Sequence, residues 1–306
     1  MDIPTLKHRA ADALSAAPYD PRRLSLLHGG IAQGASLLVT LINFLLTRRI
    51  DSTGGLAGIG TRTVLTMVQT LLTIGISVAI PFWELGFVRA GLQLSRREPT
   101  RPPVLLEGFR RFGPALRLLL LRSLLCMGVA FLCLQLSSML YMFSPLSLPF
   151  LEAAQPLLDT ANPDIAAIEA LLPYLYPVYI LFGVLLCAIL IPLLYRLRLA
   201  DMAIMDGAPG ARAAMKLSST LMRGNRFRFF RLDLQFWWYY GLLALASAIS
   251  YGDLLLSNLL PIGGDVSFWL FYIAGAAAQL VVIWRFAPLI HTTYATAYHT
   301  LSTPNA

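Results

Sequence analysis

Six stretches of this sequence are apolar enough and long enough to cross a lipid bilayer. They cover residues 24–46, 64–90, 116–141, 172–194, 234–250 and 268–290. An α-helix rises about 1.5 Å per residue, so roughly 20 apolar residues span the hydrocarbon core of a membrane. The pattern predicts an all-α polytopic membrane protein, a bundle of six transmembrane helices in one domain over residues 24–301. An N-terminal segment (1–23) and a C-terminal tail (302–306) flank this domain.

The composition supports this class and excludes an ordinary soluble domain. Of the 306 residues, 57% are hydrophobic and only 13% are charged, whereas a soluble domain carries about 25% charged residues. The 24 Lys and Arg residues outnumber the 16 Asp and Glu residues, which gives a formal net charge of +8. In a membrane protein such an excess reports first on orientation and on attraction to anionic lipid.

The basic residues are concentrated in two of the connecting segments. Residues 93–115 and 195–233 are rich in arginine, whereas residues 142–171 and 251–267 contain no Lys or Arg. Because basic loops of membrane proteins remain in the cytoplasm, this distribution predicts that both termini are cytoplasmic. The short link 47–62 disagrees, since it carries three arginines on the side predicted to be external.

Residues 221–240, LMRGNRFRFFRLDLQFWWYY, interleave arginine with aromatic residues. In a soluble protein this composition would indicate single-stranded nucleic acid. Between a basic loop and an apolar span it fits the cytoplasmic end of a transmembrane helix, so no nucleic-acid partner is predicted. The residues expected to contact anionic lipid at the inner leaflet are Arg89, Arg117, Arg122, Arg196, Arg198, Arg212, Lys216, Arg223, Arg226, Arg228 and Arg231. The expected interfacial aromatic residues are Trp237, Trp238, Tyr239 and Tyr240.

Two short helices are predicted outside the spans. Residues 211–222 place Ala214 and Met215 on one helical face and Arg212 on another, and Gly224 can end the helix in a left-handed conformation. We expect this amphipathic helix to lie on the inner leaflet before the fifth span. The sequence Asn-Pro-Asp at residues 162–164 has the order of a helix start, which predicts a small helix on the outer surface.

Four motifs resemble a known family when they are taken in order. They are PFWELGFVRAGLQLSRREP, LLEGFRRFGPAL, SSTLMRGNRFRFFRLDL at residues 218–234, and RFAPLIHTTYATAYHTL. The pattern is similar to a large bacterial family of six-span membrane proteins known only as domain of unknown function nine-seven-five. The resemblance implies a bacterial inner-membrane location and brings no activity or catalytic residue. The sequence departs from the family at Gln235, where a small residue is usual, and in the long external loop 142–171, which would suit a private partner.

Charged residues inside spans are the default indication of function in a membrane protein. Glu84 and Arg285 both fall in the cytoplasmic third of their spans, judged by helical rise, and are predicted to form an ion pair. Two interpretations of this region stay open. It could be one structural ion pair among arginines that extend to the interface, or a basic inner vestibule for lipid phosphate or another anion.

Enzyme signatures are missing from the sequence. There is no GxxxxGK[ST] phosphate-binding loop, no HExxH, no GxSxG and no metal-ligand spacing, so no catalytic residue, cofactor or metal is predicted. Cys126, Cys133 and Cys187 lie in apolar runs and are expected to be buried thiols. The leading hypothesis is a non-enzymatic inner-membrane protein that binds anionic lipid or a protein partner at its basic cytoplasmic face. The alternatives are a small-molecule transporter or channel subunit and a membrane-embedded lipid-modifying enzyme.

Overall fold

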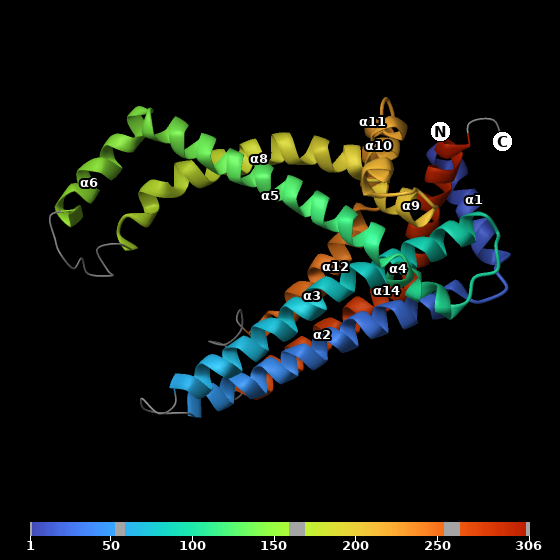
Figure 1. Cartoon of the computed structure of the whole chain (residues 1–306), viewed down its shortest axis with the longest axis horizontal. Coiled ribbons are helices and arrows are strands. Elements are labelled where there is room, and N and C mark those ends of the chain that lie inside the picture. Colours follow the sequence, from blue (N-terminus) through green and yellow to red (C-terminus); the bar gives the residue numbers. More distant parts are fainter. Residues whose placement is uncertain (1, 53–58, 159–168, 254–263, 304–306) are drawn as a thin grey trace.

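The computed structural model describes residues 2–52, 59–158, 169–253 and 264–303, which form helices joined by turns with no strand among them (Figure 1). The long helices are α2 (Pro21–Ser52), α3 (Ile59–Ser95), α5 (Phe112–Met142), α8 (Tyr176–Leu197), α12 (Trp237–Ser250) and α14 (Gly264–Ser302). The short helices are α1 (Ile3–Ser15), α4 (Glu107–Arg110), α6 (Leu148–Leu158), α9 (Ala200–Met205), α10 (Ala211–Leu221) and α11 (Arg226–Gln235). Single turns of 3-10 helix occur at η2 (Pro102–Leu106), η3 (Pro145–Ser147) and η4 (Leu172–Leu175).

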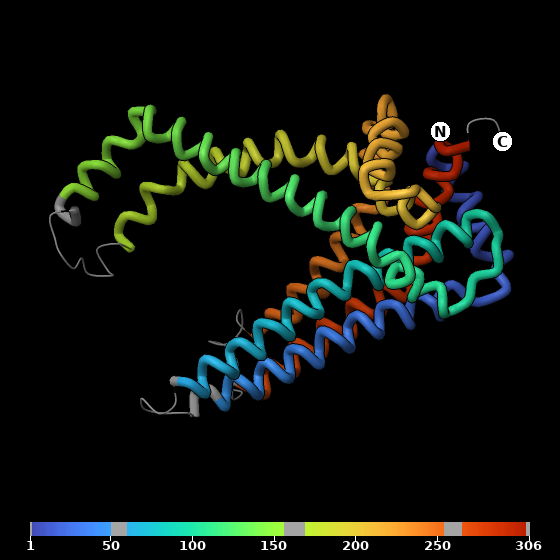
Figure 2. Tube along the Cα trace, viewed as in Figure 1, coloured from blue at the N-terminus to red at the C-terminus, as the bar shows by residue number. Residues whose placement is uncertain are grey.

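The long helices form two arms that diverge from a common hub (Figure 1, Figure 2). One arm packs α2, α3, α12 and α14 together, and the other is the α5–α8 hairpin with α6 at its far end. The hub consists of α1, α4, α9, α10 and α11 with the adjoining ends of the long helices. Helix α1 packs against α14 there, so the first and last helices meet on the same side of the molecule.

Helices α3 and α14 each pass through two different environments. With 37 residues, α3 is about 55 Å long, well beyond the ~30 Å hydrocarbon core. None of its most apolar 18-residue stretch is buried, whereas Phe82, Leu85 and Ala90 further along are buried. Helix α14 becomes buried in the same way from Ala287 onward. One half of each helix is therefore suited to lipid, and the other half builds the hub.

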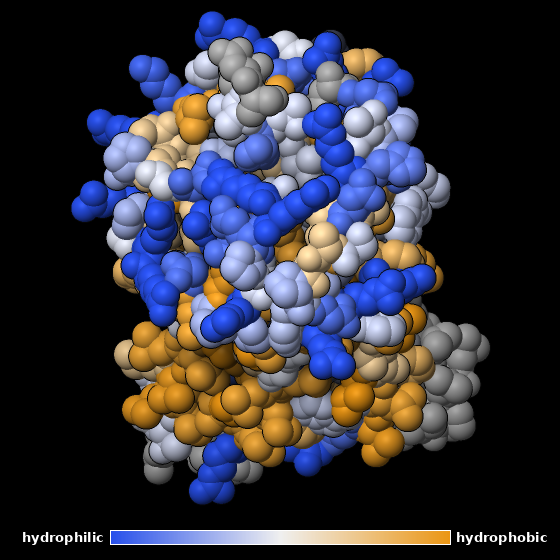
Figure 3. Space-filling view, turned by 90° about the vertical axis from the view of Figure 1, so that its right-hand side faces the viewer, coloured by the Kyte–Doolittle hydropathy of each residue, from blue (hydrophilic) through white to orange (hydrophobic). Residues whose placement is uncertain are grey.

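The surface of the molecule follows this division. Viewed from the hub side, hydrophilic residues cover the hub and hydrophobic residues gather below it, on the four-helix arm (Figure 3). An apolar surface of this size is not covered by water in a stable protein, so lipid is its natural environment.

Two glycines allow a backbone crossing that closes the hub. A Cβ atom on Gly86 of α3 would overlap the carbonyl oxygen of Leu105, and one on Gly108 of α4 would overlap that of Phe82. Only glycine permits backbones to approach so closely. The crossing fixes η2 and α4 against α3, which explains why both glycines stand inside the motifs WELGF and LEGFR.

Polar residues inside the four-helix arm connect its helices. The amide nitrogen of Gln33 in α2 donates to the amide oxygen of Gln279 in α14 at 2.6 Å, and Gln279 donates to the hydroxyl of Ser247 in α12 at 3.1 Å. Such bonds hold helices together where apolar packing provides no preference over lipid. At the far end of the arm Arg48 forms an ion pair with Asp265 of α14. Asp265 therefore neutralises the charge of Arg48, one of the three arginines in the link that was predicted to be external.

The predicted fold class is confirmed, and each predicted span coincides with one of the long helices. Within the described residues, five stretches are long and apolar enough to cross a membrane: Pro21–Arg49, Gly60–Ser95, Phe112–Met142, Leu172–Met205 and Asp265–Ser302. The sixth, α12, has 14 residues and is about 21 Å long, which is shorter than the hydrocarbon core.

The amphipathic helix predicted over residues 211–222 is α10, and Gly224 follows it in the left-handed region at φ 80°. It packs on α9, α5 and α8 through Ala211, Ala214 and Ser218, and therefore forms part of the hub. Cys187 is exposed, which corrects the expectation that all three thiols are buried, whereas Cys133 is buried. The small helix predicted from residues 162–164 lies outside the described residues.

Neither α1 nor α6 was predicted from the hydropathy pattern. Helix α1 buries Ile3, Leu6 and Ala10, and the Lys7 ammonium lies 4.7 Å from the centre of the Phe236 ring. Partial burial of the ammonium lowers the pKa of Lys7. The N-terminal segment is therefore part of the hub.

Candidate functional site

A polar cavity lies where the four-helix arm joins the hub. It has a volume of about 380 Å³ and is lined by α2, α3, α9, α12, α14 and the turn after α8. Its polar and charged lining consists of His28, Glu84, Arg198, Asp201, Tyr239, Tyr240, His291 and Tyr294. We call this the central cavity. Its size falls at the lower end of the range for small-molecule sites in proteins.

A second cavity adjoins the first where α3 meets α5 and α9. It has a volume of about 350 Å³ and shares Glu84, Val88 and Asp201 with the central cavity. We call it the side cavity. Two carboxylates, Glu84 and Asp201, therefore stand between the two cavities, and the Glu84 side chain is accessible.

Most charges around the central cavity are balanced within the protein. Arg198 donates to Asp233 at 2.6 Å, and Arg122 donates to Asp201 at 2.7 Å. Glu84 differs, because its carboxylate has neither an ion pair nor a hydrogen bond with any residue that the structure describes. The Asp201 Oδ1 atom is also buried without a partner there. Glu84 is consequently a carboxyl group of the cavity wall that no described residue compensates.

The predicted ion pair between Glu84 and Arg285 does not form among the described residues. Ile283, Ala287 and Ile290 of α14 line the central cavity with Glu84, and this spacing of three to four residues marks one helical face. Arg285 lies two residues from both Ile283 and Ala287, which places it on the opposite face, and it is exposed. Rotation about the helix axis therefore keeps the two charges apart.

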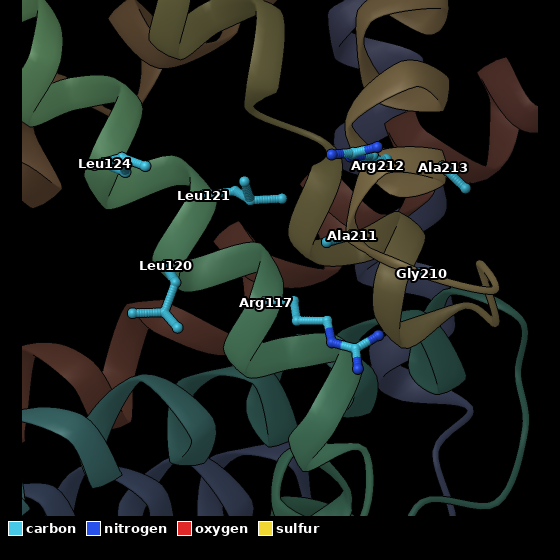
Figure 4. Close-up of a pocket in the computed structure, with 8 residues that line it drawn as sticks. All are labelled: Arg117, Leu120, Leu121, Leu124, Gly210, Ala211, Arg212 and Ala213. Carbon is cyan, nitrogen blue, oxygen red and sulfur yellow. The ribbon is translucent and has the colours of Figure 1, made fainter.

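An apolar groove with two arginines runs between α5 and α10 on the outside of the hub. It has a volume of about 520 Å³ and is lined by Arg117, Leu120, Leu121, Leu124, Gly210, Ala211, Arg212 and Ala213 (Figure 4). In this view Arg117 extends from α5 toward α10, and Leu121 points into the same space. Both arginines are exposed, and neither forms an ion pair within the part of the chain that the structure describes. We call this the α5–α10 groove.

The other basic residues predicted to contact lipid divide into two groups. Arg89, Arg122 and Arg198 form internal ion pairs with Asp206, Asp201 and Asp233, so these three hold the hub together. Arg196 donates to the Ser219 hydroxyl at 2.7 Å, and Arg228 donates to the Asn225 side chain at 3.3 Å, although both remain exposed. Lys216, Arg223, Arg226 and Arg231 are exposed, with no ion pair to another described residue.

The four predicted interfacial aromatic residues also have different roles. Trp237 is exposed, whereas the Trp238 ring packs edge-on against Phe286 at 4.7 Å between centroids. Tyr239 is buried and lines the central cavity together with Tyr240. The expectation that Tyr239 lies at the membrane interface was therefore wrong, because this residue is on the face of α12 that packs toward α14.

The acidic partners of these arginines were missed by the sequence analysis. Residues 195–233 contain only three acids, Asp201, Asp206 and Asp233, among many arginines. Asp206 accepts from Arg96 at 2.6 Å and from the Tyr298 hydroxyl at 3.2 Å. A single acid in a strongly basic segment is a candidate partner for a nearby arginine, and this signal could have identified all three.

Helices suited to lipid along most of their length, with a basic hub at one end, define an all-α polytopic membrane protein. The chain belongs to a family described as a protein of unknown function (DUF975), whose profile matches residues 25–305. No curated protein and no solved structure matches the chain significantly.

Proposed function

We propose that this protein is a non-enzymatic protein of the bacterial inner membrane that binds anionic phospholipid at its hub. In this proposal the hub and both termini are cytoplasmic, and the α5–α10 groove is the lipid site. The lipid headgroup would lie between Arg117 and Arg212, and the first part of an acyl chain would lie along the leucines of α5.

The observation that carries the proposal is the chemistry of the groove. Arg117 and Arg212 are exposed without a carboxylate partner in the described structure, whereas Arg89, Arg122 and Arg198 nearby are all paired. Unpaired guanidinium groups beside an apolar surface match a phosphate joined to a hydrocarbon chain, since guanidinium binds phosphate oxygens through two parallel hydrogen bonds. The exposed side chains of Leu120 and Leu124 supply that apolar surface.

The surrounding charge supports the same ligand. Lys216, Arg223, Arg226 and Arg231 lie exposed on the same hub. Each basic residue near an anionic membrane surface contributes about 1 kcal/mol of attraction, which is screened by salt. These residues would concentrate anionic lipid around the hub, and the groove would select the lipid that remains bound. A protein partner with an acidic surface would compete for the same residues, whereas no base-stacking site for nucleic acid is proposed.

The proposal is tested by measuring lipid that remains bound to the purified protein. The variant Arg117→Gln with Arg212→Gln should retain at least about tenfold less phosphatidylglycerol and cardiolipin by native mass spectrometry, because two charge-assisted contacts to phosphate are lost. The matched control is Arg226→Gln with Arg231→Gln, which removes the same charge from α11 outside the groove.

The control variant should lose much less bound lipid than the groove variant. Equal losses in the two variants would mean that lipid is attracted by net charge alone and that the groove is not a site. An unchanged lipid content in the groove variant would contradict the proposal as a whole.

A further inference from the structure

The central cavity has a composition that differs from that of the α5–α10 groove. The groove offers unpaired cations, whereas the cavity offers the unpaired carboxylate of Glu84 among the aromatic rings of Phe87, Tyr239, Tyr240 and Tyr294. We propose that the central cavity binds a small organic ammonium group, with Glu84 as its counter-charge. The two sites share no residue, so this proposal stands independently of the lipid site.

The charge of the cavity is the first argument. An ionisable residue within a span of a membrane protein pairs with a nearby cation, a hydrogen-bond donor or a ligand. Glu84 lies in such a helix, with its side chain accessible from two cavities. The arginines that line the two cavities are already engaged, because Arg122 pairs with Asp201 and Arg198 pairs with Asp233. A cationic ligand would neutralise the Glu84 carboxylate. The Oδ1 atom of Asp201, which has no described partner, offers a second hydrogen-bond acceptor.

His28 provides an independent indication of a missing polar group. Its side chain lines the cavity and is only 7% exposed, yet neither ring nitrogen has a hydrogen-bond partner among the described residues. Buried polar atoms in native proteins almost always have a partner. The ring is held in place by stacking on Phe87 at 4.3 Å and on Trp83 at 6.0 Å between centroids. An N–H group of a bound ammonium could donate to the unprotonated nitrogen of this imidazole.

The rings of the cavity favour an organic cation over a metal ion. Aromatic faces attract ammonium groups through their quadrupole, and the attraction is larger in a desolvated site. A metal ion would need several oxygen, nitrogen or sulfur ligands around one point. No group of three or more His, Cys, Asp or Glu residues is placed to hold a metal in the described ranges.

In this proposal the ligand approaches Glu84 through the side cavity. The side cavity lies between α3 and α5, where the two arms separate, and it reaches Glu84 and Asp201. Its other lining residues include Ile80, Pro81 and Leu119, which are apolar. An amine with an apolar body, either a free amine or the ammonium headgroup of a phospholipid, could therefore reach Glu84 between the arms.

The test uses the full-length protein in an uncharged detergent and benzylammonium as the probe. Binding is measured by equilibrium dialysis, with benzyl alcohol as a neutral compound of nearly the same shape. Wild type should bind benzylammonium at least about tenfold more tightly than benzyl alcohol, since only the cation can pair with Glu84. Equal binding of the two compounds, or no binding of benzylammonium, would overturn the proposal without any variant.

Variants then assign the charge preference to the cavity. Glu84→Gln should weaken benzylammonium binding at least about tenfold and leave benzyl alcohol unchanged. The matched control is Glu98→Gln, which removes a carboxylate just beyond α3 and outside the cavity, and which should bind like wild type. Tyr240→Leu should weaken binding of the cation, and Tyr240→Phe should preserve it, because a cation–π contact needs the ring and not the hydroxyl. Normal binding by Glu84→Gln would contradict the assignment.

Two further measurements separate the sources of the ammonium group and the two proposed sites. Short-chain phosphatidylethanolamine should displace the probe if a lipid headgroup is the natural ligand, and phenethylamine alone should displace it if a free amine is. Displacement by phosphatidylglycerol to the same extent would overturn the proposal, since that lipid has no ammonium group. The groove variant Arg117→Gln with Arg212→Gln should bind benzylammonium like wild type, so failure of the lipid proposal leaves this one intact.

Discussion

Asp233 connects three parts of the hub through one carboxylate. It accepts hydrogen bonds from the Tyr195 hydroxyl at 2.5 Å, from Arg198 at 2.6 Å and from the Tyr294 hydroxyl. These residues belong to α8, to the turn that follows it and to α14, whereas Asp233 itself lies in α11. The Arg198 guanidinium also lies 4.9 Å from the centre of the Tyr294 ring. Replacing this single carboxylate should therefore remove contacts that join three parts of the hub.

Asp233→Asn should lower the stability of the folded protein by about 2 kcal/mol, because hydrogen bonds to a charged group are lost and Arg198 remains half-buried without a counter-charge. The measurement is the midpoint of thermal unfolding in detergent. The control is Asp253→Asn beyond the far end of α12, which removes the same charge from a residue outside this cluster. Equal midpoints for the two variants would show that the cluster contributes little to stability.

At this scale the sequence predicted residue types better than it predicted partners. The sequence identifies the basic residues, but the rotation of each helix about its axis determines which of them form an ion pair with an acidic residue and which remain exposed. Arg198 and Arg212 are both in the same basic segment, yet the first is paired with Asp233 and the second lines the groove. Hydropathy averaged over a whole span carries no information about such rotation, because the average runs over several turns of helix.

The elements of the fold were predictable where lipid is the surrounding medium. The outer halves of the long helices are predominantly apolar, and this is the signal that a hydropathy pattern detects. It fails inside the hub, where α3 continues to Ser95 and α14 to Ser302, well past the ends predicted at residues 90 and 290. Both extensions carry polar residues because protein, and not lipid, packs around them. Helices α1 and α6 were missed for a different reason, since neither is long enough to resemble a span.

The glycine crossing between α3 and α4 gives a test at the scale of elements. Gly108→Ala should lower the midpoint of thermal unfolding strongly, because the new Cβ atom would overlap the backbone carbonyl of Phe82, which cannot move without shifting α3. The control is Gly128→Ala in α5, where a Cβ atom meets nothing within 4 Å. Alanine favours a helix over glycine by about 1 kcal/mol, so the control should be neutral or slightly more stable. A Gly108→Ala protein as stable as its control would mean that the crossing is not closed.

At the scale of the whole molecule, three excursions leave the hub and return to it. Two of them consist of helices that are long enough to cross a bilayer, namely α2 with α3 and α5 with α8. The third consists of α14 and α12. Helix α14 is long enough to cross a bilayer, whereas α12 is too short. Helix α12 is nevertheless held along α14 by close packing, since a Cβ atom on Gly275 would overlap the Ser250 hydroxyl. The side of the membrane on which α12 ends therefore decides the topology.

Single cysteines in a background without the three native ones test this topology directly. Phe143→Cys and Tyr251→Cys lie at the far ends of α5 and α12, and Thr220→Cys and Arg226→Cys lie on the hub. If basic segments stay inside, an impermeant maleimide should label the first two in intact cells and the hub pair only after lysis. Labelling at residue 143 without labelling at residue 251 would show that α12 does not cross and that five helices span the membrane. Labelling of the hub pair in intact cells would reverse the orientation and remove the inner leaflet as the source of the proposed lipid.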